Sequence, residues 1–178
     1  LRELLFLLPP RRRRPCVVSA TAPAHTAIFI SIVILDSIIL YFITAAALSL
    51  ERYPQLAEQI ISGGHEVCSH GWRWVHQFHM NEDQEREFID KAIDSITKTT
   101  GQRPYGWLSR YLLTPNTRRL LVEKGFLYHM DDYSDDKPFW DFVDSKAILI
   151  IPYAVDSNDM KMWTDPAYTP EQWYEYAK

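Results

Sequence analysis

The sequence has few cysteines and no large excess of charge of either sign. Only Cys16 and Cys68 occur in 178 residues, whereas small secreted domains held by disulfides use more cysteines at closer spacing. We therefore expect a reducing, cytoplasmic compartment. Lys plus Arg number 19 and Asp plus Glu number 23, a net charge of −4. This balance argues against a polyanion-binding protein, and we predict no nucleic-acid partner.

Residues 1–38 carry no pattern that predicts a folded element. A short apolar stretch is stopped by two prolines, and Arg11–Arg14 follow. Such a composition is typical of a disordered or targeting segment. The sequence begins with Leu instead of Met, so a fragment or an aberrant gene product is a further interpretation. We leave 1–38 unassigned, apolar from residue 27, and expect one folded domain over 39–178.

The most hydrophobic run, Ala27–Leu50, supports two interpretations. It is long enough for a membrane-spanning helix, and Arg11–Arg14 would then place its N-terminal end in the cytoplasm. However, Asp36 would lie within the span, where a charge is costly. The Ile, Val, Phe and Tyr content of Ile28–Ile43 favours buried parallel strands equally well. Strands are our prediction, and a membrane anchor over 27–50 is the alternative.

Helical and strand patterns alternate after residue 50. Helices are predicted from Pro54, after Asn81, from Thr114 and from Thr169. Asn81 and Gln84 have the spacing of a capping box, and the apolar residues of the helix that follows fall on one face: Phe88, Ile89, Ala92, Ile93 and Ile96. Strands are predicted at 66–69, 105–108, 126–130 and 147–153, with a loop over 135–140. A polar residue follows each strand: His70, Arg110, Asp132 and Asp159. The pattern predicts an α/β fold, a parallel barrel or layered sheet with its ligand site at the carboxyl ends of the strands.

The segment Gly64–Trp74 resembles the second motif of the polysaccharide deacetylase superfamily, of the NodB-homology type. Within it, the segment is most similar to the allantoinase-like branch, whose members open cyclic amides. Further similar segments follow in the family's order: 100–107, 115–121, 135–140 and 151–160. The resemblance covers about residues 40–178. It implies a partial, distorted (β/α) barrel, with 39–178 as a catalytic domain truncated at its C-terminus.

The resemblance also bears on metal binding. In the metal-dependent deacetylases, two histidines four residues apart help to hold a divalent ion that activates water. Here His70 matches the first histidine, but the second position is Trp74, as in the allantoinase-like branch. We therefore expect no metal cofactor. Zinc held by His70, with His76 and His79 as substitute ligands, is the alternative.

The resemblance implies a pocket with two catalytic residues, His70 and Asp132. His70 would shuttle a proton or polarise a carbonyl, and Asp132 resembles the fourth-motif acid that orients a catalytic partner. The predicted substrate-binding residues are Trp72, Arg73, Trp74, Arg110, Asn158 and Asp159. Structural alternatives stay open: a backbone carbonyl could satisfy His70, and the tryptophans could be core aromatics.

Two family motifs have no counterpart in the sequence. Asp36 lacks the acidic neighbour and glycine turn of the N-terminal motif, and the C-terminal histidine motif would lie beyond Lys178.

The resemblance implies a hydrolase of non-peptide carbon–nitrogen bonds, acting on a small amide or ureide or on an N-acetylated sugar. The missing motifs leave an inactive fragment, or a pseudoenzyme that binds a sugar or partner, as one alternative. A membrane-anchored deacetylase is another alternative. The oligomeric state is left open, with a homo-oligomer as one option.

Overall fold

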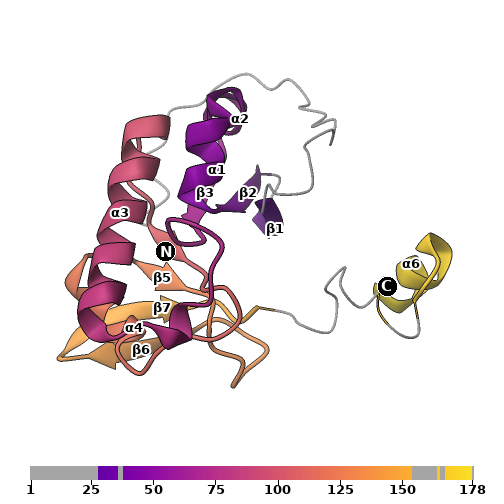
Figure 1. The fold of residues 1–178 in the computed structure, drawn as a ribbon. Helices are drawn as coiled ribbons and strands as arrows, with labels where there is room; N and C mark the ends of the chain where they lie inside the picture. The colour runs from indigo at the N-terminus through magenta and orange to yellow at the C-terminus, as the bar shows by residue number, and fades with distance from the viewer. Residues whose placement is uncertain (1–27, 36–37, 154–163, 165–166, 178) are drawn as a thin grey trace.

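A computed structural model describes residues 28–35, 38–153, 164 and 167–177 (Figure 1). The described elements are, in chain order, β1 (Ile28–Leu35), β2 (Ile38–Ala45), α1 (Ala47–Arg52), α2 (Pro54–Ser62), β3 (Glu66–Ser69), the 3-10 helix η2 (Gln77–His79), α3 (Glu82–Thr100), β4 (Gly106–Trp107), α4 (Thr117–Glu123), β5 (Tyr128–His129), β6 (Phe139–Val143), β7 (Lys146–Ile150) and α6 (Pro170–Ala177).

The strands form one seven-stranded sheet in the order β1-β2-β3-β4-β5-β7-β6. Strands β2, β3, β4, β5 and β7 are parallel to their neighbours in that series, whereas β1 and β6 pair antiparallel at the two edges. The sheet formed by the described residues is open. Its parallel strands bring their carboxyl ends to one edge, where His70, Arg110 and Asp132 follow β3, β4 and β5.

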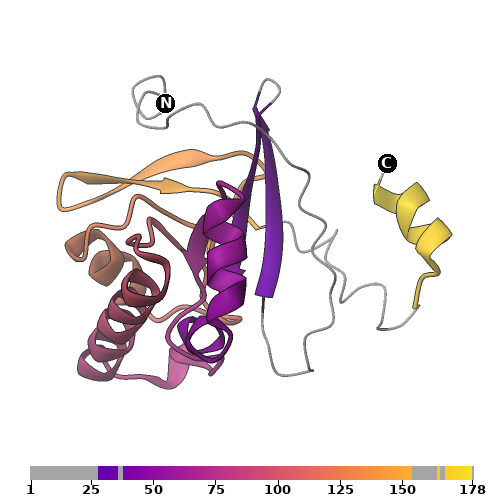
Figure 2. The same ribbon diagram turned by 90° about the horizontal axis from the view of Figure 1, so that it is seen from above.

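Helices α1 to α4 lie to one side of the sheet (Figures 1 and 2). Their apolar faces and the sheet residues that face them form two buried clusters. The predicted face of α3 is confirmed, because all its members are buried: Phe88, Ile89, Ala92, Ile93 and Ile96. This helical layer fixes the strand ends that carry the site.

The opposite face of the sheet carries a third cluster, built around Cys68, Leu108, Tyr128 and Met130. The Tyr128 hydroxyl donates to Glu66 Oε1 over 2.8 Å. Burial raises the pKa of Glu66 to about 7, although the Tyr128 hydrogen bond acts in the opposite direction. Cys68 is a buried free thiol, as its position in a core strand predicts.

The run over 27–50 does not form a spanning helix. Residues 28–35 and 38–45 are two strands paired antiparallel over their whole length, from Ile28–Ala45 to Leu35–Ile38. Among the described residues, no helix is both long and apolar enough to cross a membrane. The prediction of strands is thus confirmed, but their expected parallel pairing is wrong for β1, which pairs antiparallel with β2, whereas β2 and β3 are parallel. Arg11–Arg14, Cys16 and Asp36 lie outside the described residues.

The helix caps follow the sequence closely, with one exception. Asn81 Oδ1 accepts from Gln84 N and Gln84 Oε1 accepts from Asn81 N, at 2.9 and 3.0 Å, so the predicted capping box is confirmed. Helix α4 begins at Thr117 instead of directly after Thr114. The reason is local: the Thr114 hydroxyl oxygen accepts from Asn116 N over 3.0 Å, which holds a turn before the helix.

The predicted loop over 135–140 is wrong at its end, because β6 begins at Phe139 and forms a hairpin with β7. Asp144 and Ser145 connect the strands with φ of 48° and 64°, the left-handed pair that suits a tight two-residue hairpin turn. The sequence does not show the apolar–polar alternation of a strand in β6, because the large apolar side chains of Trp140 and Phe142 lie on its exposed face.

Candidate active site

His70 directly follows β3 at the carboxyl edge of the sheet. Its backbone N–H donates to Ala45 O over 2.9 Å, which ties it to the end of β2. Gly71 then turns the chain with φ of +79°, and a Cβ there would lie 2.4 Å from the Phe88 ring. A side chain at this position would be strained and crowded, so glycine is needed to set the direction in which the motif loop leaves.

Both ring nitrogens of the buried His70 are engaged. Nδ1 lies 2.6 Å from Leu108 O, and Nε2 lies 3.1 Å from the indole Nε1 of Trp74. A carbonyl oxygen can only accept and an indole N–H can only donate. The ring must therefore carry its proton on Nδ1 and present a lone pair at Nε2.

The surroundings keep this ring neutral. Burial lowers the pKa of His70 to about 4, and the positive charge of Arg110 acts in the same direction, while the hydrogen bond to Leu108 opposes them. At neutral pH the Nε2 lone pair is thus available to any donor that displaces the indole. A neutral imidazole at this position can accept a proton from water or from a substrate.

Arg110 and Trp74 form one unit beside His70. The Arg110 guanidinium carbon lies 3.9 Å from the centroid of the Trp74 ring, and Nη1 donates to Trp74 O over 3.0 Å. The Nε atom of Arg110 is buried without a hydrogen-bond partner among the described residues. The structure therefore brings together three of the predicted site residues: His70, Trp74 and Arg110.

Exposed aromatic side chains continue this unit across the surface. Tyr111 lies 5.0 Å from the Arg110 guanidinium and stacks on His76, with ring centroids 5.1 Å apart. Its backbone has φ of 65°, a strained value for a tyrosine. Trp74, Phe78 and Tyr111, which we name the aromatic shelf, are 45%, 37% and 55% exposed. Flat rings beside a cation can bind a planar or ring-shaped ligand.

The sequence did not single out Asp131, a buried carboxyl group close to this site. Ser109 donates to it twice, from its N–H to Oδ1 over 2.7 Å and from its hydroxyl to Oδ2 over 2.8 Å. Burial raises the pKa of Asp131 to about 7 against the effect of the Ser109 hydrogen bonds. The only available signal was its place directly after a strand, which it shares with Asp132.

Asp132 lies in a different cluster, centred on Arg118. The guanidinium donates to Asp132 Oδ2 and Asp141 Oδ2, each over 2.6 Å, and to His129 Nε2 over 3.0 Å. Burial raises the pKa of Asp132, but hydrogen bonds from Ser134 and Arg118 outweigh it, and the net shift is downward. Asp132 is therefore a paired carboxylate, and its predicted catalytic role stays a prediction.

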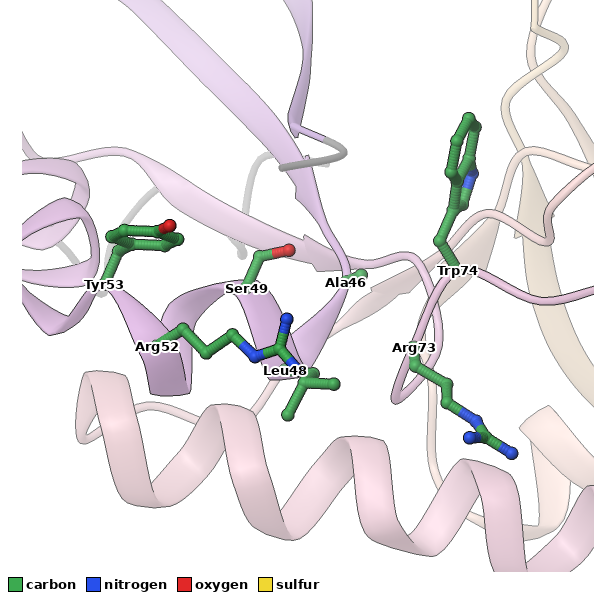
Figure 3. Close-up of a pocket in the computed structure, with 7 residues that line it drawn as sticks. All are labelled: Ala46, Leu48, Ser49, Arg52, Tyr53, Arg73 and Trp74. Carbon is green, nitrogen blue, oxygen red and sulfur yellow. The ribbon is translucent and has the colours of Figure 1, made fainter. Parts of the chain in front are cut away.

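The remaining predicted residues are scattered. Trp72 packs against both helix-facing clusters, with the Arg73 guanidinium 5.3 Å from its ring. Figure 3 shows Arg73 and Trp74 leaving the loop in opposite directions. The two line a small cavity of about 80 Å³ together with α1 residues that include Ser49 and Arg52. Asn158 and Asp159 lie outside the described residues.

The loop after His70 is anchored by a buried carboxylate from α3. Glu85 Oε1 accepts from Gln77 Nε2 over 2.6 Å and from the Thr117 hydroxyl, and Oε2 accepts from the Thr114 hydroxyl over 2.5 Å. Glu85 and Thr117 are fully buried and Gln77 is 1% exposed. The three groups thus join the motif loop, α3 and the start of α4.

The described residues do not fit a metal site. The Nε2 lone pair of His70 is directed at an indole N–H, and Trp74 has no lone pair to offer a metal. His76 and His79, the substitutes considered, have ring centroids 6.2 Å apart and lie in aromatic contacts. Within the described part of the chain, no group of three or more His, Cys, Asp or Glu could hold an ion.

A model of the polysaccharide deacetylase family matches residues 38–127. The chain belongs to the polysaccharide deacetylase family. The sequence resemblance is thereby confirmed at the level of the NodB-type superfamily. The matched segment runs from β2 to the residue before β5, and so includes His70 and the Leu108–Arg110 strand end.

Solved structures agree on the fold. A probable polysaccharide deacetylase from Pseudomonas aeruginosa PAO1 is 43% identical, with a TM-score of 0.69 over 74% of this chain and 45% of that protein. The PuuE allantoinase is 41% identical, with a TM-score of 0.70 over 75% of this chain and 46% of that protein. The predicted fold, a partial (β/α) barrel of the deacetylase type, is confirmed.

A curated relative gives the same family. The peptidoglycan deacetylase of Helicobacter pylori is 29% identical over 134 residues, which are 71% of this chain and 45% of that protein. The chain thus spans less than half the length of each of these three relatives. What the whole protein does is therefore a matter for proposal.

Proposed function

We propose that the deacetylase-family domain hydrolyses a non-peptide carbon–nitrogen bond in a small amide or ureide without a metal ion. The observation that carries this proposal is the hydrogen bond from Trp74 Nε1 to His70 Nε2. It puts an indole where the metal-dependent members have a second histidine ligand. The 41% identity to an allantoinase supports the same branch.

His70 acts as the proton acceptor of the reaction. Its ring is neutral at pH 7 because burial lowers the pKa to about 4. When a water or a substrate N–H displaces the Trp74 indole, the Nε2 lone pair accepts that hydrogen bond. A proton donor for the leaving nitrogen must come from a further group, and the family's N-terminal and C-terminal motifs have no counterpart in this chain.

Arg110 and the aromatic shelf bind the substrate. The guanidinium offers planar donors to a carbonyl or an imide, and Trp74 and Tyr111 flank it with exposed ring faces. Cyclic ureides and N-acetylated sugars share a ring and a carbonyl. The shelf accommodates both classes, and the allantoinase likeness favours the ureide.

Two rival functions remain open for this chain. The first is an inactive domain that binds a sugar or partner through the aromatic shelf. A metal-dependent deacetylase is the second, and it would need ligands beyond those that the described residues provide. We place the protein in the cytoplasm, in keeping with its buried free Cys68, and leave homo-oligomers open.

Hydrolysis of allantoin and of an N-acetylated chitooligosaccharide by the purified chain, with and without chelator, tests the proposal. We expect allantoin turnover that is unchanged by chelator and is lost in His70→Gln. Chelator-sensitive deacetylation would overturn the metal-independent mechanism. Absence of turnover from a folded protein that still binds either compound would favour the binding function.

A further inference from the structure

One peptide group connects two buried ionisable side chains. The carbonyl oxygen of Leu108 lies 2.6 Å from His70 Nδ1, and the N–H of Ser109 donates to Asp131 Oδ1 over 2.7 Å. That oxygen and that N–H belong to the same planar peptide unit and point in opposite directions. His70 and Asp131 therefore lie at the two ends of one short hydrogen-bonded chain.

We propose that Asp131 is a positioning residue for His70 and acts through the Leu108–Ser109 peptide. A carboxylate that accepts the Ser109 N–H polarises the peptide and makes the Leu108 oxygen a stronger acceptor. The stronger acceptor holds the His70 proton on Nδ1. The lone pair then stays on Nε2, which is the atom that faces Trp74 and the aromatic shelf.

The buried surroundings of Asp131 should strengthen this hydrogen-bonded coupling. Its second oxygen accepts the Ser109 hydroxyl over 2.8 Å, and that hydroxyl oxygen in turn accepts from Trp107 Nε1 over 2.9 Å. Trp107 is fully buried, and Ser109, His70 and Asp131 are 3%, 5% and 7% exposed. Hydrogen bonds in such a low-dielectric environment are stronger than in water.

The catalytic consequence rests on the function proposed for His70, but the coupling itself does not. Asp131 touches no substrate in this scheme. It strengthens the hydrogen bond that holds the imidazole proton on Nδ1 and so orients the ring, as outer hydrogen-bond partners of functional histidines do. Losing it should lower turnover without changing substrate affinity.

The test is ¹⁵N NMR of the His70 ring in the full chain at pH 8, where Asp131 is ionised because this pH lies above its raised pKa of about 7. The signals are assigned by comparison with His70→Gln. In the parent we expect a pyrrole-type signal at Nδ1 and a pyridine-type signal at Nε2. Asp131→Asn has the same shape but no charge, so the hydrogen bond from Nδ1 to Leu108 O should weaken. The Nδ1 signal and its proton should then move upfield, while Nε2 stays pyridine-type. If the domain is active, kcat should fall on the order of tenfold with KM unchanged.

Two further variants keep the test decisive. Ser109→Ala retains the backbone N–H and loses the hydroxyl with its hydrogen bonds to Asp131 and Trp107, so it should shift the same signals by less. Asp94→Asn, on the exposed side of α3, should shift nothing. A folded Asp131→Asn protein with parental His70 signals would overturn the coupling. Shifted signals in a chain that hydrolyses no amide would support the coupling and count against the proposed function alone.

Discussion

The indole N–H of Trp74 donates to Nε2 of His70 over 3.1 Å, four residues away along the motif loop. This contact occupies the one lone pair of the neutral ring. Burial, followed by the Arg110 charge, lowers the pKa of His70. Because a donor at Nε2 stabilises the neutral form of the ring, we expect the indole to act in the same direction. In the proposed mechanism, a donor of the substrate displaces this indole before it reaches Nε2.

Removing that donor should make His70 more basic. Trp74→Phe keeps a ring at the position but has no N–H, so the pKa of His70 should rise from about 4 toward the ordinary value for histidine. An NMR titration of the ring measures this. Trp140→Phe, an exposed tryptophan on β6, is the matched control and should leave the titration unchanged. An unshifted pKa in Trp74→Phe would mean that burial and the neighbouring charge and carbonyl set the pKa of His70 without the indole.

Arg110 should contribute to substrate binding through its shape as well as its charge. Arg110→Lys keeps the cation but loses the planar stacking on Trp74 and the bond to its carbonyl. We expect KM to rise about tenfold with kcat little changed, as for the loss of a contact made equally in ground and transition states. Steady-state kinetics on the best substrate measures it.

Arg103→Lys is the control for that change. Arg103 also lies over a ring, that of Phe126 at 5.8 Å, but this contact involves none of the proposed site residues. A fall in kcat with unchanged KM in Arg110→Lys would instead assign Arg110 to the chemical step.

Glu66 should make stability depend on pH. Its pKa is raised by burial from 4.5 to about 7, so between these values the folded state binds more protons than the unfolded state. Stability from this group is therefore full below about pH 4.5 and is lost as pH rises to 7. Glu66→Gln removes the charge and keeps an acceptor for Tyr128.

The free energy of unfolding of Glu66→Gln should accordingly exceed that of the parent by a difference that grows from pH 4.5 to 7, to about 3 kcal/mol at most. Urea unfolding at several pH values measures it. Glu58→Gln, exposed on α2, should show no such trend. A difference that shrinks as pH rises would contradict the predicted sign.

Glu85 should be essential for stability. Glu85→Ala leaves three buried donors, from Gln77, Thr114 and Thr117, without their acceptor. We expect a loss of about 3–5 kcal/mol in the free energy of unfolding. On the same helix, Glu87 pairs only with Lys91 at the surface, so Glu87→Ala should cost less than about 1 kcal/mol. Similar losses in both variants would show that the network is not what stabilises this region.

The sequence predicted the elements with strong local signals. The Asn81–Gln84 cap, the α3 face and the Glu66–Ser69 strand each depend on spacing within a few residues, and all are confirmed. The β6 strand was missed because Trp140 and Phe142 point to solvent and Asp141 pairs with Arg118, so no apolar alternation marks it.

The site was harder to predict, because its key contacts join distant segments. The His70–Trp74 pair lies within one motif and could be inferred, at least as a missing metal ligand. Asp131 and Asp132 are adjacent and chemically identical. Only the fold shows that one is bound by Ser109 in the interior and the other by Arg118.

The anchoring of the motif loop by Glu85 has an evolutionary consequence. Gln77, Glu85 and Thr117 lie on three segments but satisfy one another's buried polar atoms. Replacing one of them with an apolar residue leaves the buried polar atoms of the others without hydrogen bonds, which destabilises the fold. Replacement of all three together avoids that cost. Among homologues, these positions should therefore vary as a set, and a homologue that has lost the set should also have a differently shaped loop after its histidine.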